Sequence, residues 1–411
     1  SHFRPNLRRG PPWTTTWPPL PNCMPVHSPL VTYYHSVAPE LPGAKHWPLS
    51  FLTMRMDRFE EELDHIVERG WRTIHLDEWW RMRCGQERSR GNELAITFDD
   101  GLLDNWVFAF PLLKERGLKA TFFICPELIE PGDHLRPNLE DVWNGRTRME
   151  DLAGRGQLSW GECRALQRSG VVDIQNHTMT HTKHIVSDRL RGVNRGGFEG
   201  WYPAMNTCAP DERAYMAKCP DIATYIPIGM PLFEEHSAVV ARRKTIRPEF
   251  MEAARKLIGE HDLSTPDGRS THEVRLHALH AAFQARNAVV EGEESFDEHV
   301  ARVEDEIIGS KRRIEKELDK PVRFLCWPHG GNSPAVHAVA RQAGHVATTV
   351  GRWVASANER DRIPRTGTGW PLGTTMRRLK FDAKMGAAHG RQPYRALAGL
   401  NAFRHRLFNQ G

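Results

Sequence analysis

The spacing of apolar residues alternates along the chain between two patterns, one typical of buried strands and one typical of helices. Short, dense apolar runs have the length of buried strands, and between them apolar residues recur at helical spacing, as at Phe59, Leu63 and Ile66. The pattern predicts strands over residues 30–34, 71–76, 93–98, 120–125, 171–175, 322–327 and 346–350, and helices over 59–67, 105–116, 160–169, 296–318 and 333–344. Strands that alternate with helices in this way predict an α/β fold with a parallel sheet, open or closed into a barrel.

The alternation is interrupted between residues 186 and 295. Glycines punctuate the beginning of this stretch and prolines its middle, and two helical segments are expected near 248–260 and 272–290. Such a length exceeds that of a simple connection, which predicts a mainly helical subdomain inserted beside the active face. The resulting division is a Pro-rich arm over 1–29, barrel parts over 30–185 and 296–370, the insertion over 186–295 and a basic tail over 371–411.

Composition narrows the class of protein. Of the 411 residues, 39% are hydrophobic, which is enough for a large buried core, and 56 basic against 51 acidic residues give a net charge of +5. This balance argues against nucleic-acid binding and suits a neutral or anionic glycan. No apolar run reaches the length of a transmembrane helix. The basic tail is interpreted as a solvated helix or, alternatively, as a contact with a membrane surface or a partner.

Seven cysteines are scattered along the chain without a C-x-x-C pair. Their odd number and their spacing indicate neither a structural zinc site nor a disulfide framework, and mostly reduced thiols favour a cytoplasmic location. The Pro-rich beginning has no apolar h-region and does not look like a signal peptide. A periplasmic or secreted location is the alternative if a targeting segment was removed.

Two adjacent carboxylates, Asp99 and Asp100, end the strand expected at 93–98 and precede Gly101. Neighbouring residues of an extended segment point to opposite sides, so one carboxylate can ligate a metal while the other acts on a water as general base. The plain alternative is a turn or an N-cap aspartate before the next helix. In parallel α/β folds ligands bind at the carboxyl ends of strands, which favours the functional interpretation.

Two histidines, His177 and His181, stand four residues apart after the strand at 171–175. They can face one metal ion if the segment is helical or tightly turned. A chance pair is the alternative, because the chain contains 21 histidines. With Asp100 they form a two-histidine, one-carboxylate set that leaves positions for water and substrate, as a catalytic zinc requires. His184 also lies in reach and is interpreted as a neighbour of the site rather than a ligand.

Several segments resemble the NodB-homology polysaccharide deacetylases, carbohydrate esterase family 4. Residues 96–101 (ITFDDG) are similar to the first motif of that family, and residues 120–124 (ATFFI) are similar to the strand that follows it. Residues 176–181 (NHTMTH) are similar to the H-S/T-x-x-H metal motif, and residues 324–330 (FLCWPHG) to the third motif, which usually ends Pro-Tyr-Gly. The order and spacing of these segments match those of the family over about residues 31–185 and 296–368. The resemblance implies a distorted (β/α) barrel of parallel strands.

The beginning of the chain is similar to the subgroup that deacetylates poly-N-acetylglucosamine exopolysaccharide. The segment Thr32-Tyr33-Tyr34-His35-Ser36 and the stretch over 59–74 carry this similarity. In that subgroup the catalytic-acid histidine precedes motif one, which implies that His35 is the acid. The alternative for His35 is a histidine at a strand end that bonds to backbone.

The resemblance implies further roles. Asp99 is the expected base, and Asp100, His177 and His181 are the expected metal ligands, with zinc favoured and cobalt or nickel able to use the same site. A backbone N–H near Phe122 or Phe123 is expected to bind the oxyanion, and the expected substrate contacts are Trp327, Pro328, His329 and Arg365.

Two positions depart from the family pattern. Cys326 stands where the third motif often has an arginine that tunes the base, and His329 replaces the usual tyrosine. Arg365, in a segment similar to a late stretch of the exopolysaccharide subgroup, is a candidate to supply the missing positive charge.

The sequence thus predicts a metal-dependent hydrolase that removes N-acetyl groups from amino sugars of a polysaccharide or its biosynthetic intermediate. One alternative is an O-acetyl esterase or another amide hydrolase of the same fold, because both act on a polarised carbonyl. A second alternative is a glycan-binding module with a decayed site. The departures at Cys326 and His329 favour decay, whereas the retained carboxylates and histidines argue against it.

Overall fold

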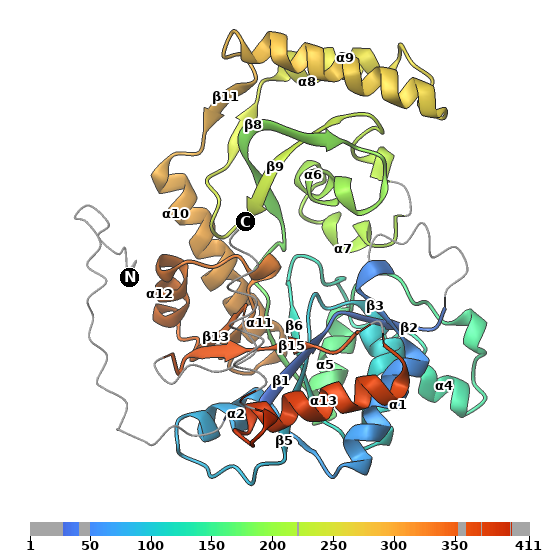
Figure 1. Ribbon diagram of the computed structural model, residues 1–411, viewed down its shortest axis with the longest axis vertical. Helices are drawn as coiled ribbons and strands as arrows, with labels where there is room; N and C mark the ends of the chain where they lie inside the picture. The colour runs from blue at the N-terminus through green and yellow to red at the C-terminus, as the bar shows by residue number, and fades with distance from the viewer. Residues whose placement is uncertain are drawn as a thin grey trace.

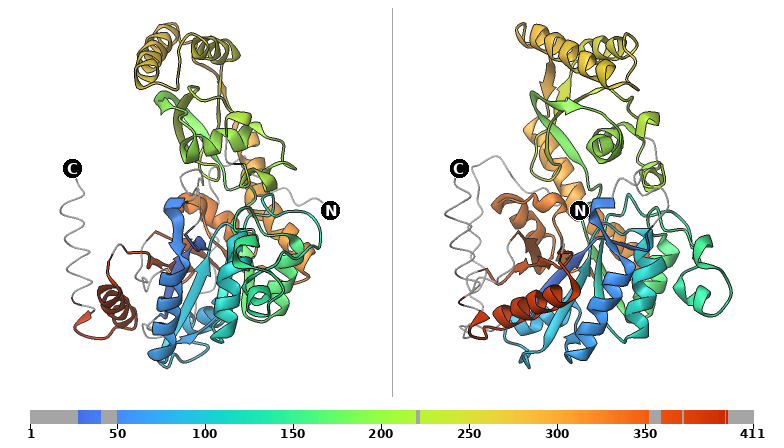
Figure 2. Two further views of the ribbon diagram at one scale, coloured as in Figure 1. Left: turned by 90° about the vertical axis from the view of Figure 1, so that its right-hand side faces the viewer. Right: turned by 45° about the vertical axis from the view of Figure 1, so that its right-hand side comes forward.

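The computed structural model describes residues 28–40, 50–219, 222–351, 359–370, 372–394 and 396. Its centre is a parallel sheet with the strand order β14-β13-β12-β7-β6-β5-β1-β15, and β4 is added beside β5. The sheet curls into a nearly closed barrel, and Figures 1 and 2 show helices around its outside. The predicted distorted (β/α) barrel is therefore confirmed.

The strands of the barrel differ in length. Except for β4, those of the first part of the chain have five or six residues, and those of the second part have two to four. They are β1 (Leu30–Tyr34), β4 (Arg72–Thr73), β5 (Glu93–Phe98), β6 (Ala120–Ile124), β7 (Val172–Asn176), β12 (Phe324–Leu325), β13 (Ala347–Val350), β14 (Arg362–Pro364) and β15 (Thr366–Gly367).

One short segment joins the two edges of the sheet. β14 pairs with β13 at one edge, and β15 pairs with β1 at the other. A single residue, Arg365, separates these two strands. The barrel is therefore closed by one stretch of chain that changes partner at Arg365.

Alternation along the strands divides the apolar core into an outer and an inner layer. Leu94, Ile96 and Phe122 belong to the core between the strands and the outer helices. Their neighbours Ala95 and Phe123 point to the other face of the strands and belong to a second core, which contains residues of other strands and of α2. Because both faces of the parallel strands are covered, the strands have almost continuous apolar sequences.

The outer helices follow the strands in sequence. Their bounds are α1 (Met56–Glu68), α2 (Leu76–Arg83), α3 (Phe110–Glu115), α4 (Leu139–Trp143), α5 (Trp160–Arg168), α10 (Phe296–Glu304), α11 (Ser310–Leu318), α12 (Pro334–Gln342) and α13 (Thr374–Ala388). The S-x-x-E sequence before α5 forms a capping box, in which Ser159 Oγ accepts from Glu162 N at 3.1 Å.

The stretch between β7 and α10 forms a unit with more residues in helices than in strands, as the sequence suggested. It holds two antiparallel strand pairs, β8 (Lys183–Val193) with β9 (Pro231–Ser237) and β10 (Lys244–Ile246) with β11 (Val290–Glu293). Its helices are α6 (Trp201–Thr207), α7 (Arg213–Met216), α8 (Pro248–Ile258) and α9 (Pro266–Gln284). Figures 1 and 2 show this unit at one end of the barrel, with α8 and α9 farthest from the strands.

The structure changes the interpretation of the chain after residue 371. α13 packs against the barrel, because its Phe381 and Met385 belong to the main core and Arg378 pairs with Glu68 of α1 at 2.8 Å. This helix is therefore part of the outer layer and not a solvated tail. Residues 395 and 397–411, like the Pro-rich arm over 1–27, lie outside the described residues. Among the described residues, no helix combines the length and the apolarity needed to cross a membrane.

Some predicted elements are shorter or interrupted. The strand expected over 71–76 is only β4, which pairs with β5 on one side, and α2 begins at Leu76. The helix expected over 105–116 begins as a π-helical turn over Asn105–Ala109. A second π-helical turn, Asp305–Gly309, separates α10 from α11. π-Helical turns are often found at functional sites, and both of these contribute side chains there.

Candidate active site

The candidate catalytic residues lie at the carboxyl ends of the barrel strands. Asp99 and Asp100 follow β5, His177 follows β7, His35 follows β1, and Arg365 lies between β14 and β15. Parallel strands bring their carboxyl ends together at one edge, which explains how residues far apart in sequence meet. They line one cavity of about 400 Å³.

Asp100, His177 and His181 form a group that can hold a metal ion. The Nε2 atoms of His177 and His181 each lie 3.1 Å from Asp100 Oδ1, and one ligand atom from each residue lies within 4.8 Å of the others. His177 Nδ1 lies 2.9 Å from the carbonyl oxygen of Cys326, to which it can donate, so that Nε2 is left to bind a metal. The pKa of Asp100 is well below its usual value, because the adjacent histidines more than offset the effect of burial.

Backbone strain is concentrated at this site. Asp100, Thr178, His181 and His329 have positive φ angles of 74°, 66°, 53° and 57°, and only two other non-glycine residues in the described part of the chain do so. Such conformations persist where the surroundings enforce them, and they cluster at functional sites. The segment from His177 to His181 is a tight turn rather than a helix, which meets the geometric condition for two histidines to face one ion.

Glu306 holds this turn from the second part of the chain. Its buried carboxylate accepts hydrogen bonds from the backbone N–H groups of Met179 and Thr180 at 3.0 and 3.1 Å, and from the Thr180 hydroxyl. Glu306 lies in the π-helical turn after α10. No motif marks it in the sequence, because its function depends on a contact across 127 positions.

Replacing Glu306 with alanine is expected to weaken metal binding about 10- to 100-fold, as loss of a group that orients metal ligands typically does. Two buried N–H groups would lose their acceptor, and the turn that positions His181 would relax. Glu306→Gln keeps one acceptor oxygen and should retain more affinity. The measurement is a competition titration with a metal indicator; equal affinity in all three proteins would contradict the assignment.

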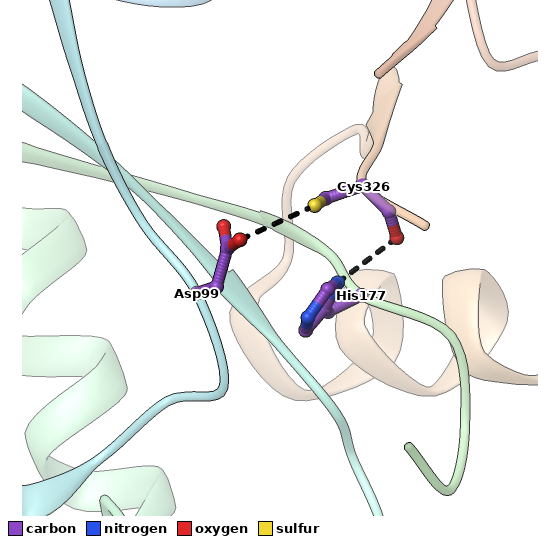
Figure 3. A group of neighbouring side chains, drawn as sticks. All are labelled: Asp99, His177 and Cys326. Carbon is purple, nitrogen blue, oxygen red and sulfur yellow. Dashed lines mark hydrogen bonds between the residues drawn. The ribbon is translucent and has the colours of Figure 1, made fainter. Parts of the chain in front are cut away.

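Asp99 is held by Arg365 in a bidentate ion pair. The guanidinium donates from Nη1 to Oδ1 at 2.7 Å and from Nη2 to Oδ2 at 2.9 Å, and Arg365 Nη2 also lies 2.9 Å from Cys326 Sγ. Figure 3 shows Cys326 between Asp99 and His177, with Sγ facing the carboxylate at 3.6 Å and the backbone carbonyl facing the imidazole. Burial raises the pKa of Asp99, but the charge of Arg365 outweighs it and keeps the pKa below its usual value.

Arg365 therefore contacts the candidate base, which is the position expected of the residue that replaces the usual arginine. Cys326 occupies the position of that arginine, and the positive charge comes from the segment between β14 and β15. Arg365 also lines the cavity, so a role in binding substrate is compatible with this position.

His35 lies beside Asp99 at the carboxyl end of β1. Its Nε2 is 3.8 Å from Asp99 Oδ2, and its side chain is partly exposed in the cavity. The backbone carbonyl of His35 accepts from Asn105 Nδ2 at 2.7 Å, and the same amide donates to Asp104 Oδ1 at 2.8 Å. Ser36 Oγ donates to the other oxygen of Asp104 at 2.5 Å. The pair Asp104 and Asn105 thus holds the chain that directly follows the His35 Cα atom.

Asp104 makes stability depend on pH. Burial raises its pKa to about 8, far above the value of about 3.9 for an unfolded chain. The folded state therefore keeps a proton that the unfolded state loses, and this contribution to stability is present in acid and is lost as pH rises through 8. Asp104→Asn does not titrate, so its melting temperature should gain on the wild type between pH 5 and pH 9. Thermal unfolding across that range measures the difference; parallel curves would contradict this pKa.

Not all of the expected substrate contacts face the cavity. Trp327, His329 and Arg365 line it, but Pro328 does not. His329 lies against His181 with 4.5 Å between ring centroids, and its Nδ1 is 3.4 Å from the Tyr202 hydroxyl. Burial, followed by the charge of His181, lowers the pKa of His329 to about 2, so its imidazole is neutral. His184 lies on β8, outside the group that can hold a metal.

The insertion, which the sequence analysis placed beside the active face, supplies one wall of the cavity through residues that no motif marked. Phe198, Trp201, Tyr202 and Lys183 line it together with Phe51. Ring contacts run from Phe51 to Phe198, then to Tyr202, with centroids 4.8 and 5.3 Å apart. Such aromatic surfaces bind the apolar faces of ligands, and the polar groups of a ligand then bond to other residues of the site.

The expected oxyanion donors are wrong. Phe122 and Phe123 are fully buried in β6, the strand between β5 and β7, and neither lines the cavity. Both neighbours of a central strand use its backbone N–H and C=O groups in the sheet. The backbone near these residues is therefore not available to a substrate.

Comparison with known proteins agrees with the site. Residues 86–208 match the sequence model of the polysaccharide deacetylase family. Over 123 residues the chain is 27% identical to YxkH of Bacillus subtilis (strain 168), which carries a provisional polysaccharide deacetylase name. The match covers 30% of this chain and 36% of YxkH, so it spans about a third of that curated relative.

Solved structures of deacetylases are similar over more of the chain, at low identity. A de-N-acetylase from Aggregatibacter actinomycetemcomitans aligns with a TM-score of 0.47 and 15% identity, over 85% of this chain and 98% of that one. The BpsB deacetylase domain from Bordetella bronchiseptica gives 0.45 and 14%, over 83% and 96%. IcaB from Ammonifex degensii gives 0.40 and 14%, over 87% and 97%.

The resemblance found in the sequence is thus confirmed over residues 86–208, which carry the sequence pattern of the polysaccharide deacetylase family. That segment includes Asp99, Asp100, His177 and His181. His35, Cys326 and Arg365 lie outside it, and their place in the site rests on the geometry described above.

Proposed function

We propose that this protein is a metal-dependent hydrolase that removes N-acetyl groups from amino sugars of a polysaccharide or of its biosynthetic intermediate. One observation carries the proposal. A carboxylate held by a buried arginine lies beside a two-histidine, one-carboxylate group, and both face the same cavity at the carboxyl ends of the strands.

The residues that would hold the metal are Asp100, His177 and His181. Their donor atoms suit zinc, and cobalt or nickel fit the same set. A metal ion bound there supplies Lewis acidity, which polarises a carbonyl group and makes a water molecule more acidic. Three protein ligands leave positions for water and substrate.

Asp99 is the proposed general base. Its carboxylate is ionised and oriented by Arg365, so it can accept the proton of the water that attacks the acetamide carbon. Asp99 is not needed as a metal ligand, because the adjacent Asp100 takes that place. The two neighbouring aspartates thus have separate tasks.

His35 is the proposed general acid. An amine is a poor leaving group unless it is protonated, and His35 is a partly exposed titratable side chain on the rim of the same cavity. Its imidazolium can give a proton to the departing nitrogen while the proton from water resides on Asp99. The net reaction adds one water and yields acetate and a free amino sugar.

The aromatic side of the cavity is the proposed sugar-binding surface. Trp327 and His329 from the barrel line the cavity with Tyr202 and Phe198 from the insertion, and the rings of His329 and Tyr202 are in contact, with centroids 4.8 Å apart. A pyranose ring presents C–H groups on its faces and hydroxyls at its edge. Aromatic rings can pack against the C–H groups, and the polar atoms of tyrosine, tryptophan and histidine can bond to the hydroxyls.

Acetate release from defined substrates tests the proposal. The zinc-loaded protein should release acetate from N-acetylchitotetraose and leave one free amine for each acetate. Acetylated xylo-oligosaccharides, which carry only O-acetyl groups, should react more slowly. Acetate from the second substrate alone would show an esterase instead, and a protein that binds no stoichiometric metal and releases no acetate would be a decayed module.

A further inference from the structure

Tyr202 of the insertion lies close to the proposed metal ligands. It belongs to the first turn of α6, and it lines the catalytic cavity together with Asp100 and His181. When water attacks an acetamide, negative charge moves onto the carbonyl oxygen, and a hydrogen-bond donor directed at that oxygen lowers the barrier. The backbone of β6 is not free to act in this way, because the strands on both sides use it. A side-chain hydroxyl that enters the cavity from the insertion is a candidate for this task.

The hydroxyl of Tyr202 points toward the histidines of the site. Its oxygen lies 3.4 Å from His329 Nδ1, and the two rings are nearly perpendicular, with centroids 4.8 Å apart. The ring of His329 in turn lies 4.5 Å from the ring of His181. The hydroxyl end of Tyr202 is therefore on the side of the cavity where a substrate carbonyl would meet the metal-ligand group.

The Tyr202 hydroxyl is held only loosely by His329. The carbonyl oxygen of His181 lies 3.4 Å from His329 Nε2 and can only accept, so Nε2 carries a proton. In the neutral ring Nδ1 then accepts from the Tyr202 hydroxyl. This distance of 3.4 Å is long for a hydroxyl donor, whose hydrogen bonds usually measure about 2.5 to 3.0 Å. The proton of Tyr202 can therefore turn to a substrate oxygen at little cost.

Packing fixes α6 against the barrel. Trp201 and Tyr202 are buried members of one apolar cluster. The same cluster contains Leu102, Cys125 and Leu128, from the segments that follow β5 and β6 at the catalytic edge. Figure 1 shows α6 nearer to the barrel strands than α8 and α9. A donor that is held in place before the substrate arrives needs no rearrangement during the reaction.

The chain that leads into α6 is also closely packed. A Cβ atom at Gly200 would lie 2.3 Å from Ile222 Cδ1 and 2.5 Å from Asn194 Oδ1, so only glycine fits there without a shift. Asn194 is buried, and its Nδ2 donates to the carbonyl oxygen of Ile226 at 3.0 Å. These contacts set the position at which Tyr202 starts the helix.

We propose that the Tyr202 hydroxyl donates a hydrogen bond to the carbonyl oxygen of the substrate acetamide as negative charge develops on it. The inference rests on the proposed deacetylase function and adds to it an oxyanion donor from the insertion. Phe198 and Trp201 belong to the same wall but have no hydroxyl, so Tyr202 is the member of this wall that can take the role.

The reaction is balanced without proton transfer from Tyr202. The water oxygen bonds to the acetamide carbon, the electron pair of the C=O π bond moves to the carbonyl oxygen, and Asp99 takes the water proton. The C=O bond then re-forms, the C–N bond breaks, and the nitrogen takes the proton of His35. With a phenol pKa of about 10, Tyr202 keeps its proton near neutral pH and acts as a donor throughout.

Tyr202→Phe removes the hydroxyl and keeps the ring in its apolar cluster. With the zinc-loaded protein and N-acetylchitotetraose, kcat should fall about 10²- to 10³-fold, the usual effect of losing one oxyanion donor. The fall in kcat/KM should be equally large, with KM changed about 3-fold or less, because the interaction forms in the transition state. Metal content and melting temperature should stay at the wild-type values.

Tyr215→Phe is the matched control. It makes the same chemical change at an exposed tyrosine of α7, in the same insertion, and should leave kcat and KM unchanged. Acetate release over a range of substrate concentrations, with metal analysis and thermal unfolding of the same preparations, gives the comparison. If Tyr202→Phe lowers the melting temperature and raises KM while kcat is kept, the hydroxyl has a structural role and the inference is wrong.

The outcomes separate this inference from the proposed function. If the wild type releases acetate and Tyr202→Phe keeps its kcat, the oxyanion role is overturned and the function stands. If the variant loses its metal ion, Tyr202 acts through the ligand group, and the oxyanion role is again overturned.

A wild type that releases no acetate would refute the function, and binding of methylphosphonate then tests Tyr202. This compound has a methyl group and tetrahedrally arranged oxygens, as has an acetamide after attack by water. By calorimetry the zinc-loaded wild type should bind it about 10-fold more tightly than Tyr202→Phe does, as expected for one hydrogen bond to a charged acceptor. Equal binding by the two proteins, or binding by neither, overturns the inference.

Discussion

Asp99→Asn is expected to lower kcat for acetate release about 10²- to 10⁴-fold, the usual contribution of a general base. An amide cannot take the proton of the attacking water. The metal content should stay at one equivalent, because the proposed ligands are Asp100, His177 and His181. Substrate affinity should change less than kcat, since the effect falls on the chemical step.

Acetate release and metal analysis on the same preparation measure both expectations. Asp297→Asn makes the same chemical change at an exposed position in the first turn of α10 and should leave kcat unchanged. If Asp99→Asn keeps more than a tenth of the wild-type kcat, Asp99 is not the base. If it loses the metal, Asp99 takes part in binding the ion.

His181→Ala is expected to remove stoichiometric metal and to lower kcat/KM on the order of 10³-fold, since metal polarisation is worth several kcal/mol in the transition state. His181 suits this test better than His177, because His177 also bonds to the Cys326 carbonyl and its loss would disturb the strand ends. Incubation of the wild type with a chelator should have the same effect, and added zinc should restore activity.

The control for this change is His277→Ala, which removes an exposed histidine of α9. Metal analysis of both variants, with turnover measured before and after addition of zinc, gives the comparison. A His181→Ala protein that keeps one tightly bound metal ion and normal turnover would contradict the proposed ligand group.

The parts of the site that could be predicted from sequence are those that local patterns encode. Asp99 and Asp100 end an apolar strand, and His177 and His181 follow another at a spacing that a turn brings onto one ion. The alternation of strands and helices predicted a parallel sheet, open or closed, and the resemblance to the deacetylase family implied the distorted barrel. Each inference needed only neighbours in sequence and the rule that parallel strands end at one edge.

The parts that could not be predicted depend on contacts between distant segments. Glu306 reaches back 127 positions to the metal-binding turn, and Phe198 and Tyr202 reach the cavity only because the insertion folds over it. The expected oxyanion donors in β6 were wrong because the sequence motif predicts the strand but not its place within the sheet. Strands on both sides of β6 use its backbone groups. The burial of one face of α13 could not be predicted either, because basic residues alternate with Phe381 and Met385 along this helix.

The two strands that Arg365 joins link the ion pair of Asp99 to the closure of the barrel. The guanidinium reaches Asp99 only when β14 has paired with β13 and β15 with β1, which are the last pairings that the chain can make. A growing chain that ends before residue 362 has both aspartates and both histidines but leaves the base without its counter-ion. Asp99 therefore gains its counter-ion only when the barrel is closed.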